Sequence, residues 1–414
     1  MTSASPLQGL LVVDLTRHLP GPLAARLLAD LGARIVKVEE PSAGDPVRAA
    51  APLVDGKSPL AAMLLAGVES VALDLKQPAA VEALRGLLAH ADVLLESFRP
   101  GTMARLGLAP DVLRERYPRL VICSLTGWGQ SGPYASRAGH DITYQAIGGA
   151  LAATGTAPAI QVADVVGAWS AASAVLAALL ARERVPGASA RRAQEPEAGE
   201  GGGTWIDQAL LDAAVHANVT GWAGEAAAPR EVGEPLPLTG VLPCYGVYPT
   251  RGGGALAVGA LEPHFWARFC AAAERPDLVD AQYATGERAH DNVAKLVASR
   301  TRDEWVELLA AHDVPAEPVL SLAEAAAHPQ VAARGVLHRA ADGLPRLGFP
   351  ARFDDARPRA PESVPELGAH TAAVLAEHDL IAGRSTRELR EAGIGPQRTR
   401  SGWLRRVLRR FRRR

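Results

Sequence analysis

The sequence is poor in cysteine and contains no long uninterrupted apolar run. Its 414 residues include three cysteines, Cys123, Cys244 and Cys270, an odd number spread far apart. This count and spacing predict neither a disulfide framework nor a metal cluster. No stretch reaches the roughly 18 apolar residues of a membrane span, and the N-terminus lacks a signal-peptide pattern. We therefore expect a cytoplasmic protein in a reducing compartment.

The first turn between a strand and a helix lacks the glycine spacing of a dinucleotide site. Residues 7–41 alternate an apolar strand, a loop, a helix and a second strand, which indicates a βαβ unit. The loop reads "RHLPGP" at 17–22, without the G-x-G-x-x-G pattern that lets a backbone approach a pyrophosphate. This absence argues against an NAD or FAD enzyme.

What the chain does contain is a repeated alternation of apolar strands and helices. The hydrophobic content of 48% and charged content of 21% are those of a globular protein long enough for two cores. Beyond the first unit, strands are expected at 68–76, 92–98 and 119–129, and helices at 78–91 and 165–183. This order predicts an α/β fold in which helices cover a parallel sheet.

Composition suggests where the chain divides. Residues 1–222 are expected to form a large α/β domain, interrupted at 184–204 by a flexible insertion rich in Gly, Pro, Ala and charge. A smaller α+β domain is expected at 223–337, where two strands are joined by the turn "RGGG" at 251–254.

The final segment, within a tail expected at 384–414, concentrates positive charge. Residues 398–414 hold nine arginines and no acid, and removing them from the net charge of −1 leaves −10. Their apolar residues fall on one side of a helix: Trp403, Leu404, Val407, Leu408 and Phe411. The pattern is typical of a short basic amphipathic helix that binds an anionic membrane surface, a nucleic acid or an acidic partner. A frayed, solvated end is an equal alternative, because so short a helix is marginal alone.

Several ordered blocks resemble one superfamily, that of the family III CoA-transferases (CaiB/BaiF-like) and 2-methylacyl-CoA racemases. They are the stretch 9–48, "ADVLLESFRPGTMARLGL", "TGWGQSGPYASRAGHDITYQAIGGAL" and "VADVVGAWSAASAVLAALLARE". The resemblance runs from about residue 7 to about 375. It implies a doubly wound, Rossmann-like large domain, to which the chain returns at 338–383 after the smaller domain. It also implies a homodimer whose subunits interlock.

Within the superfamily the segment "GHDITY" resembles the racemase branch, because the transferases usually carry a residue other than His before this Asp. Inverting a centre beside a thioester requires acid/base groups on both faces of the α-carbon. The resemblance assigns these roles to His140 and Asp164, with Glu262 of "VGALEPHFW" orienting the imidazole. Asp164 would need a pKa raised by burial, and N–H groups at the start of the 165–183 helix would stabilise the enolate. The resemblance implies no metal or redox cofactor.

Three alternatives remain open. Without the resemblance, Asp164 and Glu262 are interpreted as residues at helix starts. His140 is then interpreted as a turn residue whose hydrogen bonds are satisfied locally. A CoA-transferase would instead use Asp164 as a nucleophile that forms an acyl anhydride. A third alternative is a catalytically idle homologue that serves as a binding subunit. An activity that is lost in His140→Ala would argue against this alternative.

The substrate implied by the resemblance is an acyl-CoA thioester. Contacts to CoA are implied for five side chains: Lys37, Lys76, Arg99, Arg105 and Tyr144. The sequence departs from the family at Glu40, and at Leu65, Ala66 and Val68, where relatives carry polar or basic residues that hold phosphates. Each lost charge-assisted contact is worth roughly 1.5–3 kcal/mol, so CoA binding would weaken. The alternative is an acyl thioester carried on a protein-bound phosphopantetheine arm.

Overall fold

The structure, a computed structural model, describes residues 5–184, 202–229, 231–234, 236–354, 358 and 361–397. Most of the insertion expected at 184–204, and the arginine-rich residues 398–414, lie outside these ranges. The chain forms two compact units. Unit 1 comprises Met1–Gly148, Pro158–Ala217 and Gly335–Arg414, and unit 2 comprises Gly149–Ala157 and Asn218–Arg334.

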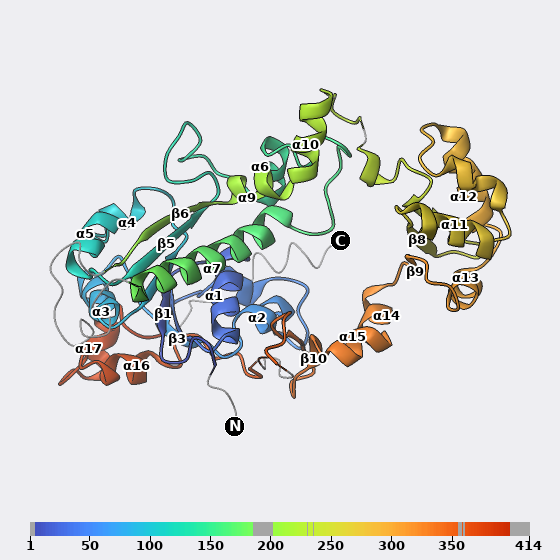
Figure 1. The fold of residues 1–414 in the computed structure, drawn as a ribbon. Helices are drawn as coiled ribbons and strands as arrows, with labels where there is room; N and C mark the ends of the chain where they lie inside the picture. The colour runs from blue at the N-terminus through green and yellow to red at the C-terminus, as the bar shows by residue number, and fades with distance from the viewer. Residues whose placement is uncertain are drawn as a thin grey trace, which may run out of the picture. The chain divides into compact units, whose positions relative to one another are not determined.

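Unit 1 is built on a six-stranded parallel sheet (Figure 1). Its strands, in spatial order, are β3 (Glu69–Ala72), β2 (Arg34–Glu39), β1 (Leu11–Asp14), β4 (Val93–Glu96), β5 (Val121–Thr126) and β6 (Trp205–Ala209). All five neighbouring pairs are parallel. The order reverses between β1 and β4, which is where doubly wound α/β proteins bind ligands at the carboxyl ends of the strands. The predicted mixed α/β fold with a parallel sheet is confirmed.

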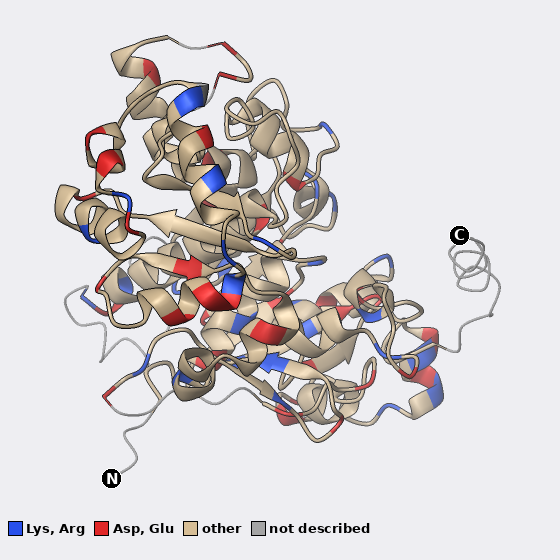
Figure 2. Cartoon of the chain, turned by 90° about the vertical axis from the view of Figure 1, so that its right-hand side faces the viewer, with Lys and Arg blue, Asp and Glu red and all other residues tan. Residues whose placement is uncertain are grey.

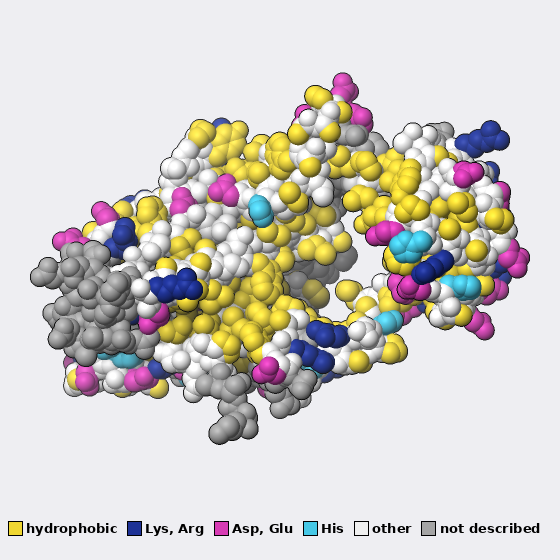
Figure 3. Space-filling view, viewed as in Figure 1, with side chains coloured by type: hydrophobic (Ala, Val, Ile, Leu, Met, Phe, Trp, Pro, Cys, Tyr) yellow, Lys and Arg dark blue, Asp and Glu magenta, His cyan; other side chains and the backbone are white. Residues whose placement is uncertain are grey.

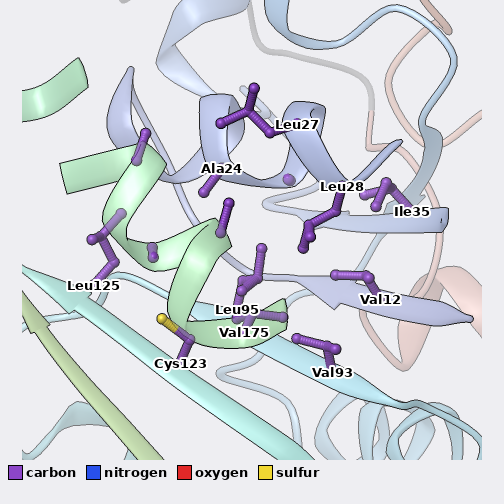
Figure 4. Close-up of a cluster of buried hydrophobic side chains, with 14 of the residues drawn as sticks. Val12, Ala24, Leu27, Leu28, Ile35, Val93, Leu95, Cys123, Leu125 and Val175 are labelled. Atoms are coloured by element: carbon purple, nitrogen blue, oxygen red, sulfur yellow. The ribbon is translucent and has the colours of Figure 1, made fainter. Parts of the chain in front are cut away.

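Helices cover both faces of this sheet because side chains alternate along each strand. Val12 packs in one core cluster and its neighbour Val13 in the other. The first cluster joins the sheet to α1 (Pro20–Asp30), α2 (Pro59–Leu64), α7 (Val162–Glu183) and α9 (Leu210–Ala217), and Figure 4 shows part of it. The second joins it to α3 (Pro78–Leu88), α4 (Thr102–Arg105), α5 (Pro110–Arg116), α16 (Thr371–Glu377) and α17 (Thr386–Glu391).

Helix α7 is the longest element of unit 1 and part of its core. Its length and composition alone would suit a membrane span. In this structure, however, its buried residues pack in the first core cluster, and its buried Arg182 donates to Asp92 at 2.9 Å. The helix begins at Val162, three residues before the expected start, so Asp164 lies inside its first turn.

The remaining elements of unit 1 are short. They are the 3-10 helix η1 (Pro46–Ala49), α6 (Asp141–Ile147), and the antiparallel strands β10 (Leu337–Arg339) and β11 (Pro345–Leu347). Segment 361–397 lies along the edge strand β3, where the Ala72 N–H donates to Thr371 Oγ1 at 3.0 Å. The far end of the described chain thus packs against the edge of the sheet that its beginning forms.

Unit 2 is organised around an antiparallel sheet of β7 (Tyr245–Pro249), β8 (Ala255–Gly259) and β9 (Ala316–Pro318). Its helices are α10 (Val219–Ala227), η2 (Pro237–Thr239), α11 (Pro263–Ala272), η3 (Pro276–Ala281), α12 (Glu287–Val297), α13 (Arg302–Leu309), α14 (Leu322–Ala327) and α15 (Pro329–Arg334). The turn at 251–254 joins β7 to β8 as predicted, with positive φ at its three glycines. Trp266, Phe269 and Trp305 stack in its core.

Basic and acidic residues are interspersed along the described chain rather than separated (Figure 2). Hydrophobic side chains are more concentrated, and Figure 3 shows them gathered in the middle of unit 1, around α7 and α1. On α7, Leu180 is 53% exposed, although the residue is apolar. One face of this core helix therefore lacks a partner within the described chain.

Candidate active site

A cavity of about 320 Å³ opens at the carboxyl edge of the sheet in unit 1. Loops that follow β1, β4 and β5 form most of its wall, because parallel strands all end at this edge. The remaining wall comes from the start of α6, the first turn of α7 and Leu210 of α9. The cavity therefore lies at the switch point of the strand order, entirely within unit 1.

His140 and Asp164 both line this cavity. His140 directly precedes α6, and Thr143 fixes its backbone: Thr143 Oγ1 accepts from the His140 N–H at 3.0 Å and donates to the His140 carbonyl at 2.7 Å. The imidazole is exposed, whereas Asp164, the third residue of α7, is half-buried. Two of the three predicted catalytic side chains thus share one site, although they are 24 positions apart in the sequence.

Asp141 links the two helices that carry these groups. Its Oδ1 accepts from the Asp164 backbone N–H at 3.1 Å, and its other oxygen accepts from Gln145 Nε2. Burial, and then the charge of Asp141, raise the pKa of Asp164 to about 7. A carboxyl of this kind can accept or donate a proton at neutral pH.

The start of α7 differs from the expected enolate-binding arrangement. The Asp164 N–H is bonded to Asp141, and the Val165 N–H donates to the Gln161 carbonyl at 2.9 Å. These two groups are therefore occupied, and Asp164 is a first-turn acid rather than a residue that precedes the helix. The expectation that these N–H groups are free to stabilise an enolate is wrong for both.

Tyr144, predicted to contact CoA, lies in the same cavity as His140. Burial, followed by the charges of Asp164 and Asp141, raises its pKa to about 12, so its hydroxyl stays protonated. Gly127 and Gly139 make room for the ring: an added Cβ would lie 2.2 Å from the hydroxyl oxygen and 2.5 Å from Cε1, respectively. The Trp128 ring meets Tyr144 edge-on at 4.8 Å.

Basic side chains line the same cavity as the two aspartates, Asp141 and Asp164. Arg99 is one that the sequence predicted, and Arg17, His18 and Arg137 are further ones that it did not. The signal that could have found them is position, since Arg17 and His18 follow the first strand and Arg137 precedes His140 in one loop. Loops after the carboxyl ends of parallel strands are where ligands bind.

A second cavity, of about 210 Å³, lies at the ends of β1, β2 and β3. It shares Arg17 and Phe98 with the first cavity, and half of its lining side chains, such as Leu15 and Leu73, are apolar. The predicted Lys76 lines it and is exposed. Arg105 lies beside it, donating to the lining residue Thr102 at 2.8 Å.

Lys37 does not line either cavity, although it was predicted to contact CoA. Its ammonium group is fully buried, donates to the Thr16 carbonyl at 2.8 Å, and lies 3.1 Å from oxygens of both Asp14 and Asp45. The cluster ties β2 to the end of β1 and to the start of η1. The structure thus places Lys37 in the core beneath the loop that carries Arg17.

The positions where the sequence departs from the family fall into two groups. Glu40 lines the second cavity, and its carboxylate accepts from Ser42 Oγ at 2.7 Å and from the Ala43 N–H at 2.8 Å. Leu65, Ala66 and Val68 are buried in unit 1. None of the four positions offers a cation to a phosphate.

Glu262 lies in unit 2, immediately before α11. Its contact with the imidazole of His140 stays a prediction, because the two residues belong to different units. Across the described ranges, no group of three or more His, Cys, Asp or Glu side chains is placed to hold a metal ion. The three cysteines are unpaired and buried.

A doubly wound α/β unit, with a histidine and a carboxyl of raised pKa in a cavity at its switch point, defines a class of protein suited to proton transfer or acyl transfer. Residues 7–371 match CoA-transferase family III, and the chain belongs to this family. The family resemblance predicted from the sequence is confirmed.

The relatives of this chain include proteins named as CoA-transferases and proteins named as racemases. The chain is 34% identical to a probable fatty acyl-CoA transferase of Mycobacterium tuberculosis, over 90% of this chain and 98% of that protein. It is 34% identical to a succinate–glutarate CoA-transferase of Agrobacterium fabrum (92% and 98%) and 32% identical to the human alpha-methylacyl-CoA racemase (90% and 93%). A crystal structure of a CaiB/BaiF family protein from Brucella suis superposes with a TM-score of 0.76 at 30% identity, covering 91% of this chain and 100% of that one.

Proposed function

We propose that the protein is an acyl-CoA racemase or epimerase that removes the α-proton of an acyl thioester and returns a proton to the opposite face. The observation that carries this proposal is that the His140 imidazole and the Asp164 carboxyl line one cavity. Two acid/base groups on one substrate-sized space are the minimum that such a 1,1-proton transfer requires.

The two groups have complementary roles. In one direction His140, in its neutral form, takes the α-proton, and protonated Asp164 donates to the other face; in the reverse direction the roles exchange. A pKa of about 7 keeps Asp164 partly protonated near neutral pH, which suits both directions. The protonated Tyr144 hydroxyl is a donor available to the enolate oxygen. We propose that Glu262 fixes the imidazole tautomer.

CoA is proposed to span the two cavities. Its nucleotide would lie in the second cavity beside Lys76, and its pantetheine arm would pass the shared residues Arg17 and Phe98 to reach His140. Arg99 and Arg105 would support the phosphates, whereas the buried Lys37 would not. Because Glu40 places an acid in the nucleotide cavity, a carrier-bound phosphopantetheine thioester is the alternative substrate. Comparing the dissociation constants of CoA and phosphopantetheine distinguishes them.

Deuterium exchange at the α-carbon tests the proposed reaction. Incubated in heavy water with branched acyl-CoA thioesters, the wild-type protein should replace the α-proton by deuterium. His140→Ala should lower the exchange rate by roughly 10²–10⁴-fold, because general acid–base catalysis contributes this much. A wild-type protein that exchanges none of the thioesters would contradict the proposal and leave the CoA-transferase and the idle binding subunit as candidates.

A CoA-transferase is the second candidate, supported by the names of several relatives. Asp164 would attack the thioester carbonyl, and the carbon–sulfur bond would break to release CoA as a thiolate and leave an acyl anhydride on the carboxyl. Hydroxylamine added with acyl-CoA would convert Asp164 to a hydroxamate in a transferase. A racemase would leave Asp164 unmodified.

We also propose a homodimer in a reducing, cytoplasmic compartment that needs no metal or redox cofactor. The apolar side chains over α7 support a partner subunit, since exposed apolar patches mark interaction sites. The buried, unpaired cysteines are compatible with a reducing compartment. Light scattering should give twice the chain mass of 43.3 kDa, and a mass equal to one chain would contradict the dimer.

A further inference from the structure

Arg17 and Phe98 line both cavities and therefore mark the place where the cavities meet. Arg17 lies in the loop after β1, and Phe98 lies in the loop after β4. Because β1 and β4 are neighbours in the sheet, these two loops start side by side at the reversal of the strand order. The pantetheine arm is proposed to pass between the cavities at this point, so whatever fixes these two loops also fixes the passage.

Both loops are held through backbone N–H groups by side chains at the end of β4. The Phe98 N–H donates to Glu96 Oε2 at 2.8 Å, and the Arg17 N–H donates to Ser97 Oγ at 3.1 Å. Glu96 and Ser97 are consecutive residues, so one short stretch of chain ties both loops to the sheet. Bonds to the backbone set where a loop lies without occupying the side chains that line the cavities.

Glu96 is a buried acid that the proposed chemistry does not use. Its exposed fraction is 2%, it lines neither cavity, and within the described ranges no basic side chain forms an ion pair with it. Burial raises the pKa of Glu96, against hydrogen bonds from Ser124 and from the Phe98 N–H, and Trp205 Nε1 fixes Ser124 Oγ at 3.1 Å. A carboxyl buried without a cation does not by itself stabilise a fold, so its bond to the loop indicates a role in the site.

We propose that Glu96 is a positioning residue that fixes the passage between the two cavities through the Phe98 N–H, and that Ser97 supports it through the Arg17 N–H. This inference rests on the proposed function for the path of CoA. It applies to racemisation and to acyl transfer alike, because both require the thioester to be delivered to Asp164.

Four variants isolate these bonds. Glu96→Met removes both acceptor oxygens but keeps an unbranched side chain of similar length. Glu96→Gln keeps an oxygen that can accept from the Phe98 N–H, and Ser97→Ala removes only the acceptor for the Arg17 N–H. Glu115→Met makes the first change at an exposed acid on α5 and is the control.

Amide hydrogen exchange and CoA binding report the two halves of the inference. In Glu96→Met, exchange should become faster in residues 97–99, while the core strands of unit 2 keep wild-type rates. The dissociation constant of CoA, measured by calorimetry, should rise about 10-fold in this variant. Glu96→Gln should restore most of the affinity, and Ser97→Ala should weaken binding by about threefold, because a hydroxyl is a neutral acceptor. Glu115→Met should match the wild type in both measurements.

The kinetic constants separate positioning from damage to the fold. With an acyl-CoA that the wild type converts, Glu96→Met should raise KM about 10-fold and change kcat by less than about twofold. The reason is that His140 and Asp164 lie at the starts of α6 and α7, outside this loop. A purely structural role would instead reduce the amount of folded enzyme, which lowers kcat and leaves KM unchanged.

CoA affinity or amide exchange that stays at the wild-type level in Glu96→Met would overturn this inference alone. So would a Glu96→Gln protein that binds CoA as weakly as Glu96→Met. If Glu96→Met does not fold, Ser97→Ala carries the test, and wild-type CoA affinity in that variant would overturn the inference. A wild-type protein that binds no CoA would overturn the proposed function, and this inference with it.

Discussion

At the scale of single residues, the environment of Asp164 determines how activity depends on pH. Its pKa of about 7 has two causes, burial and the nearby charge of Asp141, and only the second can be removed by one isosteric change. Asp141→Asn keeps an oxygen for the Asp164 N–H and removes the charge. The pKa of Asp164 should therefore fall below 7 but stay above its usual value.

The predicted consequence appears in the profile of kcat/KM against pH. For the enantiomer whose α-proton His140 removes, Asp164 must be protonated to donate, so kcat/KM falls as the pH rises through about 7. In Asp141→Asn this fall should move to lower pH. Asp291→Asn, which changes an exposed carboxyl on α12, should leave it in place. A fall at unchanged pH in Asp141→Asn would contradict the assignment of Asp164.

The same carboxyl makes a predictable contribution to stability. Its pKa is raised from 3.8 to about 7 on folding, so the folded state binds the proton more tightly. The carboxylate therefore destabilises the fold increasingly as the pH rises from about 4 to 7, and fully above 7. Asp164→Asn should raise the melting temperature at pH 8 by more than at pH 5, measured by calorimetry, with Asp291→Asn as control. An equal change at both pH values would contradict this.

The sequence identified His140 and Asp164 because they occur in the order and spacing of a recognisable family, and the structure places both at one cavity. It could not reveal that Lys37 is buried, because the sequence of a strand does not show whether a lysine ammonium group is exposed to solvent or paired with two buried aspartates. The sequence did not single out Arg137 either, because its stacking on the Tyr134 ring is a contact that no spacing predicts.

At the scale of elements, the ends of β1 and β2 are joined by a buried ion cluster. Lys37→Met would leave the carboxylates of Asp14 and Asp45 buried without their cation. Breaking a buried ion pair in this way should lower the free energy of unfolding by about 3–5 kcal/mol. Denaturant unfolding measures the loss.

Lys76→Met is the matched variant, since Lys76 is exposed at the second cavity. It should change the stability by less than about 0.5 kcal/mol but weaken CoA binding. The reverse pattern, a stable Lys37→Met protein with poor CoA binding, would contradict the placement of Lys37.

Helix α7 shows how far element boundaries follow from sequence. Its existence and apolar face were predictable, but it begins at Val162 rather than 165. An acid near a helix start is favourable both as a cap and in the first turn, so Asp164 alone does not fix the boundary. In the structure the Asp164 N–H donates a tertiary hydrogen bond to Asp141, which favours the first-turn position.

At the scale of the whole molecule, charge is concentrated in residues 398–414, which lie outside the described residues. We propose that this segment binds an anionic membrane surface. The full chain should co-sediment with vesicles containing anionic lipid at low salt and dissociate as salt is added, because such attraction is screened. Removal of 398–414 should abolish vesicle binding while leaving α-proton exchange intact. Binding by the truncated chain, or none by the full chain, would contradict the proposal.

His140 and Asp164 are proposed to act on opposite faces of one α-carbon, and stereochemistry tests this proposal most directly. A single enantiomer of a 2-methylacyl-CoA is incubated with the protein in heavy water and analysed by chiral chromatography and mass spectrometry. We expect both enantiomers, with deuterium at the α-carbon of the inverted product, and no inversion by His140→Ala or Asp164→Asn. Retained configuration and an unexchanged α-proton, with acyl groups trapped on Asp164, would contradict it.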